Sequence, residues 1–429
     1  MLALISSLIV VATCDLGELF AKPEAWEVTS TDFAVEHQQD GFVFASQKRD
    51  IVNCLRKGGC TWYGLEVWES RLYFGADRIN RIELSLYNRG DDTDSDGLNA
   101  EELKTLLDAA AAKAQPSGKI GSNPQKVKNR LGGFQYSKSF DKGDNLVELA
   151  WGVNGAKAKT QSADYVRVTL RPKPTKRKPK GATKSVSGNA AKAKVKAHVK
   201  SNSDGDVWIG DVPMVDQGQK GYCAAAVSER LLRYYGHDID EHEIAQQAGS
   251  LADGGTKVRS MIETVKEIGV KKRLGFNQIV SMAGSFDDIT KEVVQYNKAA
   301  KSMKEAEISL AAHTQGNSVI VNEIYDEMKP KVLKSMRLKD SRYKKFLTGV
   351  KTQVDKGIPI CWGVTLGIFP EPGLNIQGRG GHMRLIIGYN AKTHEVLYTD
   401  TWGAGHELKR MPEDWAFTVT HDAFFLRPL

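Results

Sequence analysis

Cys223 has the surroundings that a sulfur nucleophile needs. Val227, Leu231 and Tyr234 follow it at helical spacing, so we expect an amphipathic helix that starts at or beside the cysteine. The glycine-punctuated segment 217–221 comes before it and disfavours regular structure. At such a junction the free N–H groups and the positive end of the helix dipole favour thiolate over thiol. The pattern predicts a reactive cysteine, and the alternative is an inert buried thiol.

A nucleophilic cysteine also needs a base and a group that orients this base. His382 follows a glycine-rich loop and begins the apolar run 383–388, so it stands at the mouth of a predicted buried strand. A second predicted strand, 395–399, ends in Asp400. If the two strands form a hairpin, Asp400 can approach the imidazole of His382 and fix its tautomer. We therefore predict that Cys223, His382 and Asp400 act together, although a core histidine and a turn carboxylate are the alternatives.

Two globular regions carry or flank these residues. The chain has 429 residues, of which 41% are hydrophobic and 26% charged, which is enough for two ordinary domains. Residues 171–206 are rich in Lys, Pro, Ala, Gly and Ser and predict an extended linker. The linker separates a small mixed α+β domain at 22–170 from a second domain at 207–429, which contains the candidate chemistry.

The N-terminal domain shows the alternation of half-buried strands. Apolar and polar residues alternate over 82–86 and 166–170, and less regularly over 62–68 and 146–151. Residues 100–112 have helical composition with leucines on one face. We therefore expect several antiparallel strands with one helix, in a domain whose role the sequence does not indicate.

The positive charge is concentrated in the linker. The eleven Lys and Arg residues of 171–200 exceed the net charge of +8, so the rest of the chain is slightly acidic. This stretch contains no aromatic residue that could stack on bases, which argues against a nucleic-acid partner. The linker could contact an anionic surface, but a solvated spacer is the simpler interpretation.

The N-terminus resembles an export signal. Residues 1–13 are uncharged and mostly apolar, but they are too few to span a membrane, and no other segment is long and apolar enough. We expect a signal over 1–21 and an extracytoplasmic protein, with a cytoplasmic one as the lesser alternative. Cys14 follows Val-Ala-Thr and only approximates a lipidation site.

No cofactor is expected. The five cysteines match no zinc spacing, while Cys54 and Cys60 flank a glycine turn that leaves a disulfide between them open. A weak calcium-loop pattern fails at its twelfth position, where Leu103 replaces the bidentate glutamate. An acidic turn before the helix is the alternative. Its carboxylates are those of Asp92, Asp94 and Asp96.

Residues 207–429 resemble the papain-like cysteine peptidases, and among them the bacterial C39-like peptidases. In that superfamily a glutamine six residues before the nucleophile supplies an oxyanion donor, and Gln217 stands six before Cys223. Gly381-His382 followed by a hydrophobic strand matches the family's histidine segment. The segment 400–403, Asp-Thr-Trp-Gly, is similar to the family's Asn-Ser-Trp-Gly, in which the tryptophan shields the histidine pair.

The resemblance implies a cysteine peptidase that acts on peptides or proteins, with a papain-like α+β fold. The interval between the cysteine and the histidine is long and contains a predicted helical insertion at 287–303, 318–336 and 341–355, so substrate preference does not carry over. Cys361 lies in an apolar run and is expected to be packing. Two alternatives stay open: a transglutaminase-like acyltransferase with the same triad, and a peptide-binding domain without turnover.

Overall fold

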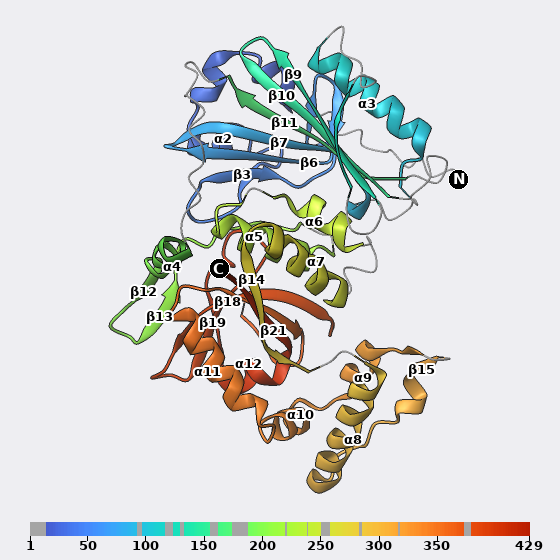
Figure 1. Cartoon of the computed structure of the whole chain (residues 1–429), viewed down its shortest axis with the longest axis vertical. Helices are drawn as coiled ribbons and strands as arrows, with labels where there is room; N and C mark the ends of the chain where they lie inside the picture. Colours follow the sequence, from blue (N-terminus) through green and yellow to red (C-terminus); the bar gives the residue numbers. More distant parts are fainter. Residues whose placement is uncertain are drawn as a thin grey trace, which may run out of the picture.

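The computed structural model consists of two domains stacked along the long axis of the molecule (Figure 1). The N-terminal domain and the C-terminal domain each have a hydrophobic core of their own. The structure describes residues 14–429 except for 92–96, 116–122, 129–132, 155–161, 174–187, 219–220, 238, 250–257, 283–284, 316–317 and 373–378.

The N-terminal domain is built on an antiparallel sheet. Its strands, in spatial order, are β2 (Val43–Phe44), β3 (Ile51–Cys54), β6 (Glu69–Gly75), β7 (Arg78–Asn88), β11 (Ser162–Pro172), β10 (Asn145–Asn154), β9 (Phe134–Lys142) and β8 (Gln125–Lys128). Helix α3 (Ala100–Ala114) packs across β9, β10 and β11. It begins at a capping box in which Asn99 and Glu102 bond each other's backbone N–H groups.

The N-terminal domain starts earlier than the sequence suggests. Strand β1 (Cys14–Asp15) pairs with β4 (Cys60–Trp62), and the short helix α1 (Leu16–Leu19) follows it directly. The side chains of Cys14, Leu16 and Phe20 are buried in the domain core. The expected boundary at residue 22 therefore lies inside the domain, and a buried Cys14 does not fit a lipid-bearing terminus. Four further elements complete this part: η1 (Pro23–Glu27), α2 (Ser30–Glu36), β5 (Leu65–Val67) and η2 (Arg89–Asp91).

The central strands of this sheet are buried on both faces. Ile82 and Leu84 lie in the domain core, as the alternation predicts. Glu83 and Ser85 on the opposite face, where the pattern predicts solvent, are also buried, with 8% and 5% exposure. The prediction of half-buried strands is wrong here because the C-terminal domain covers the polar face.

The C-terminal domain contains a second antiparallel sheet. Its order is β12 (Val199–Ser201), β13 (Asp206–Ile209), β18 (Gly381–Asn390), β17 (Ile360–Thr365), β21 (Thr420–Pro428) and β14 (Leu274–Ser281); β19 (Glu395–Thr399) pairs with β18 and with β20 (Lys409–Pro412). Helices α5 (Cys223–Tyr234) and α6 (Glu241–Ala248) lie between this sheet and the N-terminal domain, next to α7 (Val258–Lys271) (Figure 1). Helix α12 (Glu413–Val419) precedes β21.

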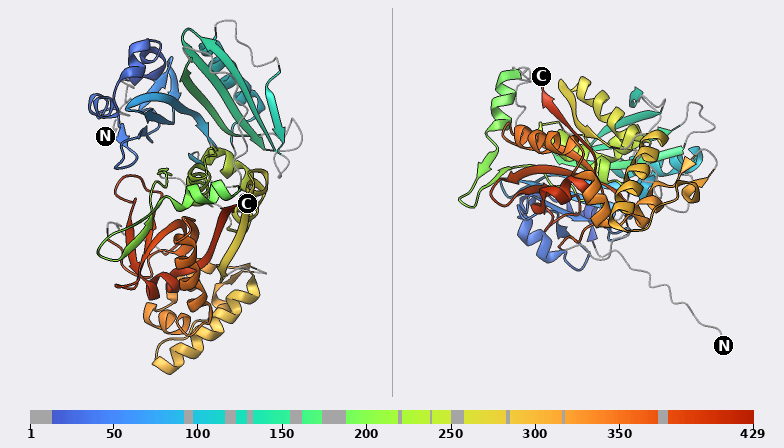
Figure 2. Two further views of the ribbon diagram at one scale, coloured as in Figure 1. Left: turned by 60° about the vertical axis from the view of Figure 1, so that its left-hand side comes forward. Right: turned by 90° about the horizontal axis from the view of Figure 1, so that it is seen from below.

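The predicted helical insertion is confirmed with one break. Helix α8 (Phe286–Met303) and helix α11 (Arg342–Val354) match two of the three expected segments. The third is split into α9 (Val321–Glu327) and α10 (Pro330–Arg337), because Pro330 lacks an N–H group and forces Lys329 into an extended conformation. Together with η4 (Leu310–His313), β15 (Thr314–Gln315) and β16 (Ser318–Val319), α8–α10 project from the end of the molecule away from the N-terminal domain (Figures 1 and 2).

Much of the predicted linker is folded. Helix α4 (Gly188–Lys196) buries Val195 in the C-terminal core, and β12 and β13 form a hairpin that joins the sheet through β18. Residues 174–187 lie outside the described residues, so the interpretation as an extended spacer stays a prediction only for them. The remainder of 171–206 extends β11 or belongs to the C-terminal domain.

Three smaller expectations have different outcomes. All five cysteines are free thiols, so the disulfide between Cys54 and Cys60 is not formed. The calcium-loop residues 92–96 lie outside the described part of the chain, as do the apolar residues 1–13. Among the described residues, no helix has both the length and the apolar character that crossing a membrane requires.

Candidate active site

Helix α5 begins at Cys223, as the sequence predicts. Tyr222 occupies the N-cap position and makes no side-chain capping bond. Val227 and Leu231 are fully buried in the C-terminal core, so the apolar side of the helix holds its axis in place. Cys223 itself is only partly buried. Its sulfur therefore stands at the positive end of a firmly packed helix.

The predicted hairpin brings His382 and Asp400 together. Strands β18 and β19 pair antiparallel with Leu385 opposite Thr399, so residue 400 lies beside the start of β18. The Nε2 atom of His382 is 2.6 Å from Oδ1 of Asp400. The imidazole also forms a hydrogen bond with Cys223, and Nδ1 is the ring nitrogen left for it. The three side chains thus form a continuous chain of contacts.

Electrostatics in this cluster favour an ion pair between sulfur and imidazole. Burial raises the pKa of the Cys223 thiol, but the charge and hydrogen bond of His382 and the N–H of Met383 outweigh it and leave the pKa lowered. Burial lowers the pKa of His382, whereas Asp400 and Cys223 act in the opposite direction and raise it to about 9. Both shifts favour the ion pair of thiolate and imidazolium over the neutral pair of thiol and imidazole.

Asp400 is held by more than the histidine. Its Oδ2 atom lies 2.8 Å from Nε of Arg384, and the backbone N–H of Thr401 donates to Oδ1 at 2.9 Å. Burial would raise the pKa of this carboxyl, but His382 and Arg384 hold it well below its usual range. Arg384 in turn pairs with Glu371 at 2.9 Å. Asp400 is therefore ionised and fixed in orientation.

Trp402 covers the imidazole. Its ring stacks on that of His382 with centroids 4.4 Å apart and planes 11° from parallel. Gly403 follows with φ +76°, and a Cβ on it would overlap the carboxylate of Asp216, so this close approach requires glycine. The stacked indole therefore lies over one face of the imidazole.

Gln217 joins the cluster through Thr401. The hydroxyl of Thr401 donates to Oε1 of Gln217 at 2.5 Å, and the backbone N–H of Gln217 donates to the Thr401 carbonyl at 2.9 Å. Because Oε1 accepts from Thr401, the orientation of the Gln217 amide is fixed, and its Nε2 group is the hydrogen-bond donor. The side chain is buried, with 7% exposure for the residue.

Two arginines in this region escaped the sequence analysis. Arg384 interrupts an apolar strand, and Arg230 of α5 is buried, donating to the carbonyl of Asp400 at 2.5 Å and to the Thr399 hydroxyl at 2.7 Å. Arg230 therefore ties α5 to the end of β19. A charged residue within the apolar run 383–388 could have marked Arg384 as a buried, paired side chain. The sequence does not show that its partner is Asp400. Cys361 is fully buried in β17, consistent with packing.

Two groups of side chains could each offer three ligand atoms to a metal within the described residues. The groups are Cys14, His37 and Asp40, and Glu69, Glu241 and His242. Neither group includes a residue of the Cys223 cluster.

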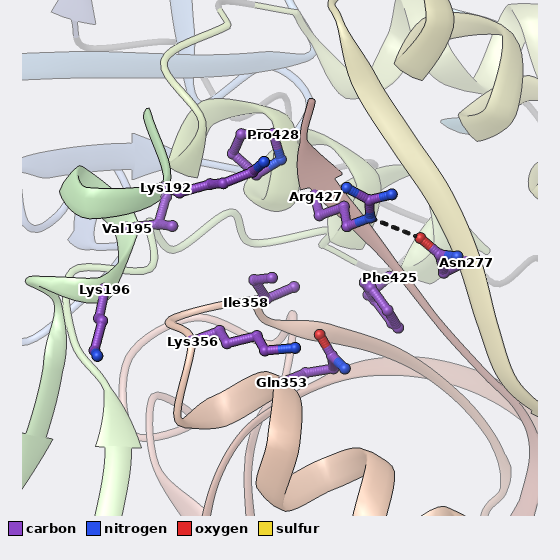
Figure 3. Close-up of a pocket in the computed structure, with 10 residues that line it drawn as sticks. All are labelled: Lys192, Val195, Lys196, Asn277, Gln353, Lys356, Ile358, Phe425, Arg427 and Pro428. Atoms are coloured by element: carbon purple, nitrogen blue, oxygen red, sulfur yellow. Dashed lines mark hydrogen bonds between the residues drawn. The ribbon is translucent and has the colours of Figure 1, made fainter. Parts of the chain in front are cut away.

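A cavity of about 430 Å³ lies apart from the cluster, between α4, the C-terminal end of β21 and the region after α11 (Figure 3). Its apolar wall includes Val195, Ile358 and Phe425, and four cations stand around it: Lys192, Lys196, Lys356 and Arg427. Arg427 donates to Asn277 at 3.0 Å. None of the predicted site residues lines this cavity.

Comparison with known proteins assigns this half of the chain. Residues 209–420 match the model of the Peptidase_C39 like family. A solved structure described as xylellain, a cysteine protease from Xylella fastidiosa, is 15% identical, with a TM-score of 0.26, over 55% of this chain and 89% of that chain. None of the curated proteins matches the chain. By this match, residues 209–420 are similar to the C39-like peptidase family, in a domain that combines α-helices with an antiparallel sheet.

Proposed function

We propose that the C-terminal domain hydrolyses peptide bonds by covalent catalysis at Cys223. The observation that carries this proposal is the contact chain from Cys223 through His382 to Asp400 at the start of a buried helix. A domain that only binds peptides has no need of a thiol with a lowered pKa next to an imidazole with a raised one.

In the proposed mechanism the Cys223 thiolate attacks the substrate carbonyl carbon. The carbonyl oxygen becomes an oxyanion, stabilised by the Gln217 side-chain N–H and the Cys223 backbone N–H. The His382 imidazolium then donates its Nδ1 proton to the leaving amine. Water, deprotonated by the neutral imidazole, then attacks the thioester, which releases the acid and restores the thiolate and the imidazolium. Asp400 keeps His382 oriented throughout and stabilises its charged form.

Cleavage of a denatured-protein or peptide-library substrate by the full chain tests the proposal. We expect Cys223→Ala to remove cleavage, while Cys361→Ala, which changes a buried thiol outside the site, keeps it. New peptide termini are read by mass spectrometry. Full cleavage by Cys223→Ala protein would contradict the proposal, and amide products formed only when a primary amine is added would favour the acyltransferase.

Thiol labelling provides a readout that needs no substrate. Iodoacetamide should modify Cys223 rapidly near neutral pH and slow down only in acid, because the thiolate is the reacting form. Absence of labelling in the folded chain would favour a domain that binds without turnover.

A further inference from the structure

The N-terminal domain contacts the C-terminal domain through a charged and buried surface. We define the docking face as the polar side of strands β6, β7 and β11, which carries Glu69, Arg71, Tyr73, Glu83, Asn88 and Arg167. Arg71 and Asn88 are 5% and 0% exposed. The face covers α5 and α6, so the helix that begins at Cys223 lies between the N-terminal domain and its own sheet.

Arg71 connects this face to the segment that carries Gln217. Its Nη2 atom donates to the backbone carbonyl of Asp216 at 3.2 Å and pairs with Glu241 of α6 at 2.6 Å. Asp216 directly precedes Gln217, and its carboxylate accepts the N–H of Gly218 at 3.0 Å. A guanidinium of the N-terminal domain thus holds the backbone on one side of the proposed oxyanion donor.

Tyr222 connects the same face to Cys223. Its hydroxyl donates to the side-chain oxygen of Asn88 at 3.2 Å. A Cβ on Gly90 would overlap the Tyr222 hydroxyl, so glycine is required for the ring to fit. Tyr222 is the residue before Cys223. Its contacts with Asn88 and Gly90 of the N-terminal domain therefore fix the position of the first peptide of α5.

The body of α5 is also anchored to the docking face. Arg233 donates to the Tyr73 hydroxyl at 2.8 Å and pairs with Glu229, one turn earlier, at 2.7 Å. Arg167 reaches α6 instead, where it lies 2.9 Å from both Asp240 and Glu243. Arg71 and Arg167 therefore make similar buried interdomain pairs, but only Arg71 touches the segment next to Gln217.

We propose that the N-terminal domain is a structural part of the active site. In this proposal Arg71 positions Gln217, and the contact of Tyr222 with Asn88 positions Cys223. This inference rests on the proposed function and gives the domain a role in turnover, in place of inhibition or substrate capture. Arg71 is a positioning residue: it acts through Asp216. Misplacing a catalytic group by about 1 Å can cost about 10²-fold in rate.

The test compares Arg71→Met with Arg167→Met in the full chain. Both variants remove one buried interdomain guanidinium. We expect Arg71→Met to lower kcat by about 10-fold to 10²-fold with little change in KM, and Arg71→Lys to recover part of the loss. Arg167→Met should keep kcat per folded molecule near the original value. Unchanged kcat in Arg71→Met, or equal losses in both variants, would overturn the proposal.

Hydrogen exchange distinguishes failure of this proposal from failure of the proposed function. If the unmodified chain cleaves no peptide, the function fails, but exchange of the amides in 216–223 can still be measured. Arg71→Met should speed their exchange more than Arg167→Met does, and Tyr222→Phe should speed the end nearest Cys223. Identical exchange in the Arg71→Met and Arg167→Met variants would refute the positioning role on its own.

Discussion

Two buried charge clusters lie against the same helix, and they differ in composition. The cluster at the start of α5 contains Cys223, His382, Asp400 and Arg384. The pKa of its thiol is lowered and the pKa of its imidazole is raised, so both shifts favour the charged form. The cluster on the docking face uses guanidinium and carboxylate groups, and burial raises the pKa of one of them, Glu229, to about 8 although Arg233 and Arg71 act in the opposite direction. The comparison indicates that a thiol next to an imidazole is kept for chemistry, while pairs of guanidinium and carboxylate groups join the domains.

Replacing His382 should have the largest effect on the first cluster. His382→Ala removes both the partner that favours the thiolate and the proton donor, and general acid–base catalysis alone contributes about 10²–10⁴-fold. We expect a loss of kcat of at least that size, measured on a cleaved peptide, without opening of the interdomain contact in limited proteolysis. Normal turnover in His382→Ala would contradict a catalytic role for the Cys223 cluster.

Removing Arg233 from the second cluster should act mainly on stability. Arg233→Met leaves Glu229 buried with one partner fewer, and loss of one member of a buried pair costs about 3–5 kcal/mol. Denaturant unfolding should report this loss, while kcat per folded molecule changes little because Arg233 is near the far end of α5. Lys104→Met, which removes an exposed pair with Asp108, is the control and should change stability by less than about 1 kcal/mol.

Gln217→Ala should lower kcat without abolishing it. Loss of one oxyanion donor typically costs about 10²–10³-fold, or about 2.7–4 kcal/mol of transition-state stabilisation. Thr401→Val removes the hydroxyl that holds the Gln217 amide and should give a smaller loss in the same parameter. If Thr401→Val were the more damaging of the two, the orientation inferred for this amide would be incorrect.

The pH dependence of kcat/KM tests the Cys223 cluster with the smallest expected effect. The pKa of His382 is raised to about 9, so the imidazolium is present below that value and is lost as pH rises through it. We expect kcat/KM to fall above about pH 9. In Asp400→Asn the carboxylate charge is gone, so the fall should begin at a lower pH. A decline that stays in place in this variant would show that another group controls it.

Local patterns predicted the elements of the site, and tertiary contacts supplied the rest. The helix at Cys223 and the hairpin that carries His382 and Asp400 follow from residue periodicity, which acts over a few turns or strands. The docking face could not be recognised, because Glu83 alternates with its neighbours in the same way whether it faces water or another domain. The folded part of the linker was missed for a related reason: its few apolar residues, such as Val195, are buried by distant strands.

The polar character of the docking face has a consequence for how the chain is made. The N-terminal domain is complete before the ribosome has synthesised α5, so its outer sheet face waits in water until its cover arrives. An apolar surface would favour self-association during that interval, whereas this face carries Glu69, Arg71 and Glu83, which the C-terminal domain buries only later. The order of synthesis therefore leaves a charged face, and not an apolar one, open to water until α5 is made.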